Sequence, residues 1–268
     1  MSADEMNLNT RATVDLNADI GEGFGRYRIE GDEALLRMIS SANIACGFHA
    51  GDANTMAETV LRCRDAGVAV GAHPGFPDLL GFGRRRMEVA PAEVANMVVY
   101  QMGALDGFAR VAGVRLHHVK LHGALYNMAA TDPELADAVA QAVLTYDPLL
   151  PLVASGGSCM DEAARRVGLT VVREVFADRA YRPDGTLVDR GTPGAVLTDA
   201  NAAAARIARL IRDGRIVAQD GTLLNLTAES ICVHGDNEAA LAMVAAIRRE
   251  LAAAGITVRA YDPGTQPS

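Results

Sequence analysis

Several features that would assign this chain to a broad class are missing from its sequence. No run of about 18 apolar residues is present, so no segment is expected to cross a membrane. The first ten residues include Asp4 and Glu5 and contain neither a basic nor an apolar region, so they do not resemble a secretory signal. No basic stripe is visible and the net charge is −8, which argues against nucleic acid or an anionic membrane as a partner.

Cysteine and nucleotide-binding motifs are also scarce. The four cysteines form no CxxC pair and no disulfide framework, so we expect a reducing, cytoplasmic setting. No P-loop is present. The run Gly21-x-Gly23-x-Gly25 lacks the third glycine of a dinucleotide fingerprint at the required spacing, and Asp19 and Glu22 would place carboxylates beside phosphates. We therefore reject a Rossmann site.

What the chain does contain is a repeated order of helix, glycine and strand. Gly67, Gly113, Gly168 and Gly255 each follow a helical pattern and precede a β-rich run, which favours a parallel sheet. The predicted helices span 32–41, 54–66, 91–112, 132–146, 158–167, 199–213 and 237–254. The predicted strands span 13–18, 42–46, 68–72, 116–121, 151–155, 169–174, 230–234 and 256–260.

This count predicts an α/β fold, a TIM-like barrel of seven or eight strands, with a doubly wound open sheet as the alternative. We expect a single domain over residues 13–262, between a frayed N-terminus (1–12) and a tail (263–268). Turn signals at Arg182–Gly185 and Gln219–Thr222 predict a hairpin, a helix and a second hairpin inserted at about 176–229.

Two predicted strands each carry one polar and one apolar face. Side chains alternate along a strand, so His118, Lys120 and His122 would share one face, and Asp15, Asn17 and Asp19 would share a face of the first strand. Ionisable groups on one side of a strand are costly unless that side meets a polar cavity or water. We predict that these faces meet in the mouth of a barrel. The alternative is a pair of solvent-exposed edge strands.

Polar residues and glycines also gather after the predicted strands, where α/β folds form their sites. Five of the six histidines, all but His117, lie in these strands or loops, and none lies in a predicted helix. Three features there remain ambiguous. The run Ser155–Ser158 is either an anion cradle or a tight turn, Cys46 and Cys232 are either nucleophiles or buried and inert, and Arg84–Arg86 is either a phosphate clamp or a solvated surface.

The same loops would suit a metal ion. His49, His73 and His122, with a carboxylate such as Asp15 or Glu22, supply suitable ligand types. No HxxH or HExxH spacing supports the site, so this hypothesis depends on the loops converging in the fold.

Together, the polar runs resemble the LamB/YcsF family, whose members are A subunits of the bacterial 5-oxoprolinase. The resemblance covers roughly residues 13 to 262, with every motif in order. The runs that carry it are Asp15–Gly25, Ser41–Asp52, Val70–Asp78, His118–Asn127, Glu174–Tyr181 and Cys232–Asp236.

The resemblance implies a fold, a reaction and partners. The fold would be a seven-stranded TIM-like barrel of the glycoside hydrolase/deacetylase type. The reaction would be the ATP-dependent opening of 5-oxo-L-proline to L-glutamate, with Mg²⁺ as the metal that accompanies ATP. Two further subunits, B and C, would complete the enzyme.

Strand parity and this reaction together give each candidate residue a hypothetical role. Lys120 would be the cation at an ATP-activated lactam oxygen, and His122 or His234 would be base or acid, with His73 also in the catalytic set. Asp15 and Glu22 would orient them. The candidate substrate-binding residues are Asn17, Asp19, His49, Asn127, Glu174 and Asp236. Two rival hypotheses are a metal-dependent deacetylase and a non-catalytic subunit that positions its partners.

Overall fold

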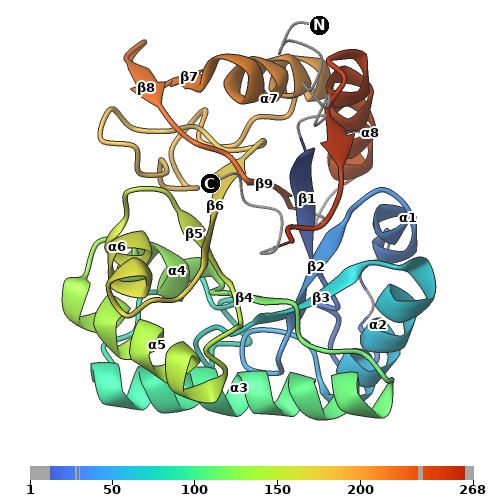
Figure 1. The fold of residues 1–268 in the computed structure, drawn as a ribbon, viewed down its shortest axis with the longest axis vertical. Helices are drawn as coiled ribbons and strands as arrows, with labels where there is room; N and C mark the ends of the chain where they lie inside the picture. The colour runs from blue at the N-terminus through green and yellow to red at the C-terminus, as the bar shows by residue number, and fades with distance from the viewer. Residues whose placement is uncertain (1–12, 28, 30, 235–237, 263–268) are drawn as a thin grey trace, which may run out of the picture.

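Seven parallel strands close into a barrel in the computed structural model of the chain, which describes residues 13–262 except 28, 30 and 235–237 (Figure 1). The ring closes because β1 pairs with both β2 and β9, the latter from Asp15 opposite Ser230 to Ala18 opposite Val233. The predicted barrel is therefore confirmed, and the open sheet and the exposed edge strands are wrong. The barrel strands are β1 (Thr13–Ile20), β2 (Ser41–Ala45), β3 (Ala69–His73), β4 (His118–Lys120), β5 (Leu152–Ser155), β6 (Val171–Phe176) and β9 (Ser230–Val233).

Helices surround the barrel, with α3 along one side and α7 and α8 along the opposite side (Figure 1). Within the described part of the chain, no helix has both the length and the apolar character needed to cross a membrane. The helices are α1 (Asp32–Leu36), α2 (Ala53–Ala66), α3 (Pro91–Val111), α4 (Gly123–Ala129), α5 (Pro133–Tyr146), α6 (Cys159–Arg166), α7 (Ala200–Asp213) and α8 (Glu238–Ala253).

Local sequence signals explain most helix ends. The Asp199 side chain caps α7 by accepting hydrogen bonds from the Asn201 and Ala202 amides. Pro91 and Pro133 open α3 and α5. The four glycines predicted to end helices all have positive φ, between 68° at Gly67 and 87° at Gly168. Asp236, a candidate substrate-binding residue, lies outside the described residues.

Two predicted elements differ from the structure. The helix expected over 32–41 ends at Leu36, because Ser40 instead donates a hydrogen bond to the Asp15 carboxylate and Ser41 begins β2. The strand expected over 116–121 is only His118–Lys120, and Gly123 starts the unpredicted helix α4. His122 is thus the residue before a helix and not a strand residue, so strand parity was the wrong basis for its position.

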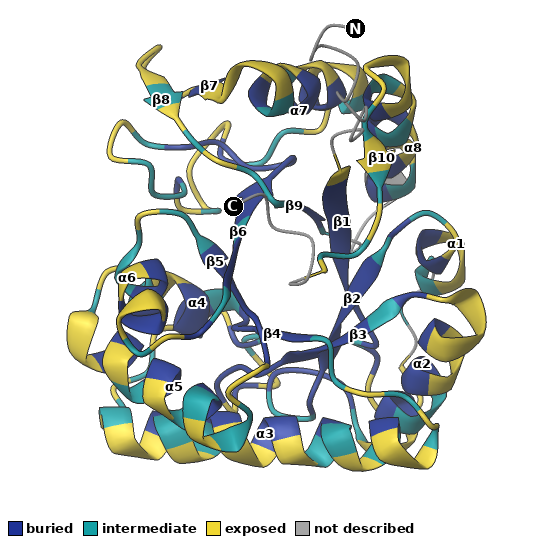
Figure 2. Cartoon of the chain, in the orientation of Figure 1, coloured by how far each residue is buried: buried dark blue, intermediate teal, exposed yellow. Residues whose placement is uncertain are grey.

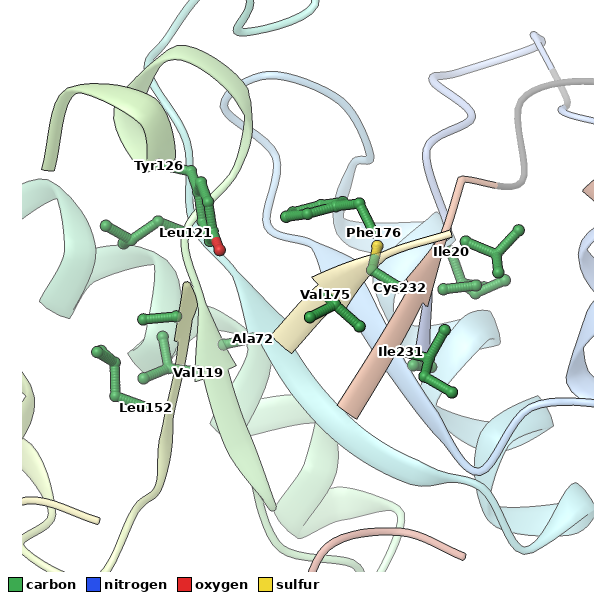
Figure 3. Close-up of a cluster of buried hydrophobic side chains, with 14 of the residues drawn as sticks. Ile20, Ala72, Val119, Leu121, Tyr126, Leu152, Val175, Phe176, Ile231 and Cys232 are labelled. Carbon is green, nitrogen blue, oxygen red and sulfur yellow. The ribbon is translucent and has the colours of Figure 1, made fainter. Parts of the chain in front are cut away.

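The two faces of the barrel wall differ in polarity. The residues on the face toward the helices are apolar and buried. Figure 2 shows the burial of the strands and of the inner sides of the helices. Strand register places Val119 beside Leu152 and Val175 beside Ile231 on this face (Figure 3). The inner face carries the alternate residues, which are largely polar and equally buried.

A long segment between β6 and β9 contains α7 flanked by two antiparallel pairings. Before α7, isolated bridges join Arg179 to Val196 and Tyr181 to Leu187. After α7, β7 (Arg215–Val217) pairs with β8 (Leu223–Asn225). The last strand, β10 (Thr257–Val258), pairs with the start of β1 outside the ring.

Candidate active site

The interior of the barrel is a column of buried polar side chains that begins at Asp15. The Asp15 carboxylate accepts hydrogen bonds from the hydroxyls of Ser40, Ser41 and Ser230. Asp15 is 5% exposed and does not line the cavity at the carboxyl ends of the strands. Its position at the base of the column makes it a structural acceptor and not a neighbour of the histidines.

The next layer is a network of amides. Asn17 donates to the Ser230 hydroxyl at 2.7 Å and accepts from Asn43 at 2.7 Å. Asn43 also donates to Asp19, at 2.9 Å, and its oxygen accepts from His118 Nε2 at 2.8 Å. Burial disfavours the charged imidazolium and lowers the pKa of His118 well below its usual value. Because each group has a partner here, the network holds the next layer rigidly.

Lys120 occupies the upper layer, at the carboxyl end of β4. Its ammonium lies 2.8 Å from Glu174 Oε2, 3.7 Å from Asp19 Oδ1 and 3.2 Å from the Asn17 oxygen. Burial acts to lower the pKa of Lys120, but Cys232 and the two carboxylates raise it well above its usual value. Burial also raises the pKa of the Cys232 thiol well above its usual value, so the thiol is neutral and Glu174 and Asp19 supply the stabilising charge. Lys120 is therefore a fixed, buried cation.

Lys120 is also the only lysine in the chain. Of 25 basic side chains one is lysine, which leaves 24 arginines. An ammonium is a compact charge with three donors, whereas a guanidinium is larger and planar. That the single lysine lies 2% exposed inside the barrel indicates that this position needs the smaller cation. This count is visible in the sequence and marks Lys120 without any structural information.

A cavity of about 900 Å³ opens above this layer, at the carboxyl ends of the strands. Its floor includes Asp19, His73, Lys120 and His122. Asn127, predicted to follow a strand, reaches the wall from α4. The segment 182–191, which precedes α7, forms the opposite side. This is the end of the barrel at which α/β barrels carry their sites.

The far wall is basic. Arg179 is 4% exposed, its Nε has no hydrogen-bond partner within the described part of the chain, and one terminal amine donates to the Val188 carbonyl. Burial and the charge of Arg190 lower the pKa of Arg179 to about 10. Beside it, His234 Nδ1 lies 2.8 Å from Asp178 Oδ2 and the His234 ring stacks on Phe176. Asp178 and Arg179 lie in the polar run Glu174–Tyr181 after a predicted strand, but they were not among the predicted site residues because nothing in their spacing signals burial.

Two of the floor residues, His73 and His122, form a cluster with Glu22 and His49. Glu22, His49, His73 and His122 each offer one ligand atom, and these atoms lie within 4.8 Å of one another. They come from the loops after β1 and β2, from the end of β3, and from the start of α4, so the expected convergence of His49, His73 and His122 occurs in the fold. A set of three imidazoles and one carboxylate is chemically able to hold a divalent metal ion.

The ambiguous loop features also have definite positions. Ser158 caps α6 and the Gly157 amide donates to Asp161, so this segment is a turn with part of its donor capacity already used. Arg85 is paired with Asp78, and Arg86 with Glu88, at exposed positions, whereas Arg84 lines the cavity. Cys46 is buried, and burial raises the pKa of its thiol to about 12, which argues against its use as a nucleophile.

The chain is similar in sequence and in structure to known proteins. The A subunit of a 5-oxoprolinase from Heliobacterium modesticaldum is 56% identical over 92% of this chain and 97% of its own length. The A subunit from Bacillus subtilis is 49% identical over 92% of this chain and 96% of its own. Among solved structures, a lactam utilization protein from Thermus thermophilus matches with a TM-score of 0.88 and 46% identity, over 93% of this chain and 100% of that one.

A more distant structure shares only the fold. The family 4 carbohydrate esterase from Streptomyces lividans is 14% identical with a TM-score of 0.53, over 95% of each chain.

The model of the LamB/YcsF family matches residues 14–266, nearly the whole sequence. The chain therefore belongs to the LamB/YcsF family.

Proposed function

We propose that this chain is the A subunit of an ATP-dependent 5-oxoprolinase, which opens the lactam of 5-oxo-L-proline to L-glutamate together with the B and C subunits. The observation that carries the proposal is the buried Lys120, held by Glu174 and Asp19 at the floor of the cavity. The names of the close relatives support the choice of substrate. The four free cysteines support a cytoplasmic setting.

The chemistry of a lactam explains why a fixed cation is needed. A lactam is a resonance-stabilised amide, and its carbonyl carbon is a poor electrophile. Transfer of the γ-phosphoryl group of ATP to the amide oxygen, with ADP as the leaving group, would activate that carbon toward water. Water would add to the carbon, the ring C–N bond would break as the nitrogen takes up a proton, and hydrolysis of the remaining acyl phosphate would release inorganic phosphate. Lys120 would stabilise the negative charge of the phosphoryl group bonded to the oxygen, because a preorganised cation in a dry site acts strongly on such charge.

The basic wall would orient the substrate. 5-Oxoproline carries one carboxylate, and the Nε of Arg179, which no described residue bonds, is a suitable donor for it. Arg84 and Arg190 add positive charge to the same cavity and would suit the phosphates of ATP with its Mg²⁺. His234, whose Nδ1 is held by Asp178, would serve as the base that activates water.

A glutamate-release assay on the assembled enzyme tests the proposal. Wild-type chain with the B and C subunits should release glutamate from 5-oxoproline only when ATP is present. Lys120→Met should lower the rate by at least about 10³-fold, the scale on which charge-stabilising groups act. Arg212→Met, which removes an exposed cation paired with Asp213, should leave the rate unchanged.

Because Lys120→Met leaves Glu174 buried without its partner, Lys120→Met/Glu174→Gln provides a second variant, expected to be inactive, in which residue 174 carries no charge and Asp19 keeps its hydrogen bond from Asn43. A folded double variant with full activity would show that the chain only positions its partners. Glutamate release by the wild type without ATP would instead favour metal-dependent amide hydrolysis. The cluster of Glu22, His49, His73 and His122 is the observation that supports that second candidate.

A further inference from the structure

The contact between His73 and His122 places two ring nitrogens against each other. His73 Nδ1 lies 2.8 Å from the Lys120 carbonyl oxygen, and His122 Nε2 lies 2.8 Å from the Phe82 carbonyl oxygen. A carbonyl oxygen only accepts, so each of these nitrogens carries a proton. In neutral rings the remaining nitrogens, His73 Nε2 and His122 Nδ1, both present lone pairs, and they face each other at 3.0 Å.

Two facing lone pairs repel unless a cation lies between them. His117 and His118 also place two Nδ1 atoms 3.1 Å apart, but His117 is partly exposed and water can hydrate a proton there. His73 and His122 are 1% and 3% exposed.

His49, beside the contact between His73 and His122, also has unusual surroundings. It is completely buried, and neither of its ring nitrogens has a hydrogen-bond partner among the described residues. Its ring stacks on His122 with centroids 3.6 Å apart and planes 2° from parallel. A buried imidazole without a hydrogen bond costs free energy unless a ligand satisfies it.

Glycines hold these rings in place. A Cβ at Gly75 would lie 2.8 Å from His49 Nδ1, and one at Gly83 would lie 2.7 Å from His49 Cβ and 2.8 Å from His122 Cδ2. The backbone therefore approaches the imidazoles as closely as it can. The cluster is a packed, preformed arrangement and not a loose collection of surface groups.

The spacing of the cluster suits a small tetrahedral ion. Ligand atoms at zinc bond lengths lie about 3.3–3.5 Å apart. The separations here are 3.0 Å between His73 and His122, 3.7 Å between His49 Nε2 and Glu22 Oε1, and 4.0 Å between His122 Nδ1 and Glu22 Oε1. They lie on both sides of the ideal value, so modest movements of the side chains would complete the site. Three imidazoles and one carboxylate select borderline transition metals over Mg²⁺.

We propose that Glu22, His49, His73 and His122 bind one divalent transition-metal ion, of the Zn²⁺ or Co²⁺ type, at the floor of the cavity. His73 Nε2 and His122 Nδ1 are the first ligands, Glu22 the third, and His49 completes the set by tilting off the His122 ring. His73 and His122 also line the cavity, so a bound ion would lie at the cavity floor. The binding step itself needs neither lactam, ATP nor partner subunits.

Titration of the full, metal-stripped chain with Co²⁺ and Zn²⁺ tests this proposal. One equivalent of Co²⁺ should bind and give the intense visible absorption of a tetrahedral site, and one equivalent of Zn²⁺ should remove that absorption. Binding should also raise the melting temperature, because an ion that binds only the folded chain stabilises it. Mg²⁺ should compete poorly.

Variants identify the ligands. Glu22→Gln and His122→Asn should each weaken Co²⁺ binding at least about 100-fold, a loss of about 2.7 kcal/mol. His117→Gln, which alters the other histidine pair, should bind as the wild type does. Circular dichroism of each variant checks that the barrel is intact.

Two results would overturn the proposal. One is the absence of Co²⁺ and Zn²⁺ binding to the wild type, which would assign the His73–His122 contact to a proton shared with Asp19, whose Oδ2 lies 3.3 Å from His73. The other is binding that Glu22→Gln and His122→Asn leave unchanged in folded protein. Neither result bears on ATP-dependent glutamate release, so a failure of this site and a failure of the proposed function are distinguishable.

Discussion

Both faces of the barrel wall are buried, but their side chains are stabilised in different ways. On the outer face, Leu16, Val119 and Ile231 are fully buried against helices and need no specific partner. On the inner face, Asp15, Asn17 and Lys120 are almost as deeply buried, yet each is held by hydrogen bonds or ion pairs. Barrels of this type more often fill their interior with branched apolar residues.

The two faces therefore differ in how they respond to substitution and in what they position. Apolar burial is non-directional, so the outer face tolerates substitutions that keep volume and hydrophobicity. A buried polar network needs every partner in place, because a single unmatched donor or acceptor costs about 1–3 kcal/mol, and more when charged. The inner network thereby fixes Lys120 and Asp19 under the cavity, at the cost of sensitivity to small changes.

The largest contrast should come from adding one methyl group at a glycine. A Cβ at Gly71, on the inner face of β3, would lie 2.0 Å from His118 Nε2. His118 would have to leave Asn43, so Gly71→Ala should destabilise the chain by about 3 kcal/mol, the upper range for overpacking. Gly107→Ala, in an exposed part of α3 where no atom lies within 4 Å of the new Cβ, should stabilise it by about 0.5–1 kcal/mol.

Urea unfolding of both variants and the wild type measures these changes in the free energy of unfolding. Equal effects of the two substitutions would mean that the inner face is no more tightly packed than the helix surface. That result would contradict the difference between the two faces.

A smaller contrast comes from deleting one non-hydrogen atom on each face of β9. Ser230→Ala removes the hydroxyl that donates to Asp15 and accepts from Asn17, so two buried groups lose a partner. We expect a loss of about 2–3 kcal/mol. Ile231→Val, at the next position and on the outer face, removes one methylene and should cost about 1 kcal/mol. Thermal and urea unfolding of both variants test the order, and a greater loss for Ile231→Val would reverse it.

Sequence reasoning predicted the features that depend on local pattern. The repeated helix, glycine and strand order predicted the parallel sheet, and alternation along β1 and β4 placed Asp15, Asn17, Asp19, His118 and Lys120 on inner faces. Both signals are short-range consequences of backbone geometry. They did not predict how far each inner residue lies from the mouth of the barrel. Asp15 was therefore expected at the mouth but lies at the base.

Features that depend on long-range contact were beyond the sequence. Asn43 and Ser230 are unremarkable in their own strands, and only closure of the ring makes them partners of Asn17. The facing nitrogens of His73 and His122 depend on two carbonyl groups from other segments. The burial of Arg179 likewise depends on the segment around Val188, which no local pattern relates to it.

The smallest expected effect concerns the accessibility of the cysteines on the two faces. Cys63 lies outside the barrel, on the buried side of α2, and Cys232 lies inside the barrel with its sulfur 3.0 Å from Lys120 Nζ. Burial raises the pKa of Cys63 to about 12 and that of Cys232 well above its usual value, so neither thiol reacts readily as a thiolate. Iodoacetamide at pH 8 should therefore modify the native chain once, at the partly exposed Cys159, and the unfolded chain four times, as mass spectrometry would show. Cys159→Ser should leave the native chain unmodified.

The contrary result would be early modification of Cys232 but not of Cys63. It would mean that solvent reaches the inside of the barrel more easily than the buried side of α2. The polar column would then be hydrated and not held by its own hydrogen bonds.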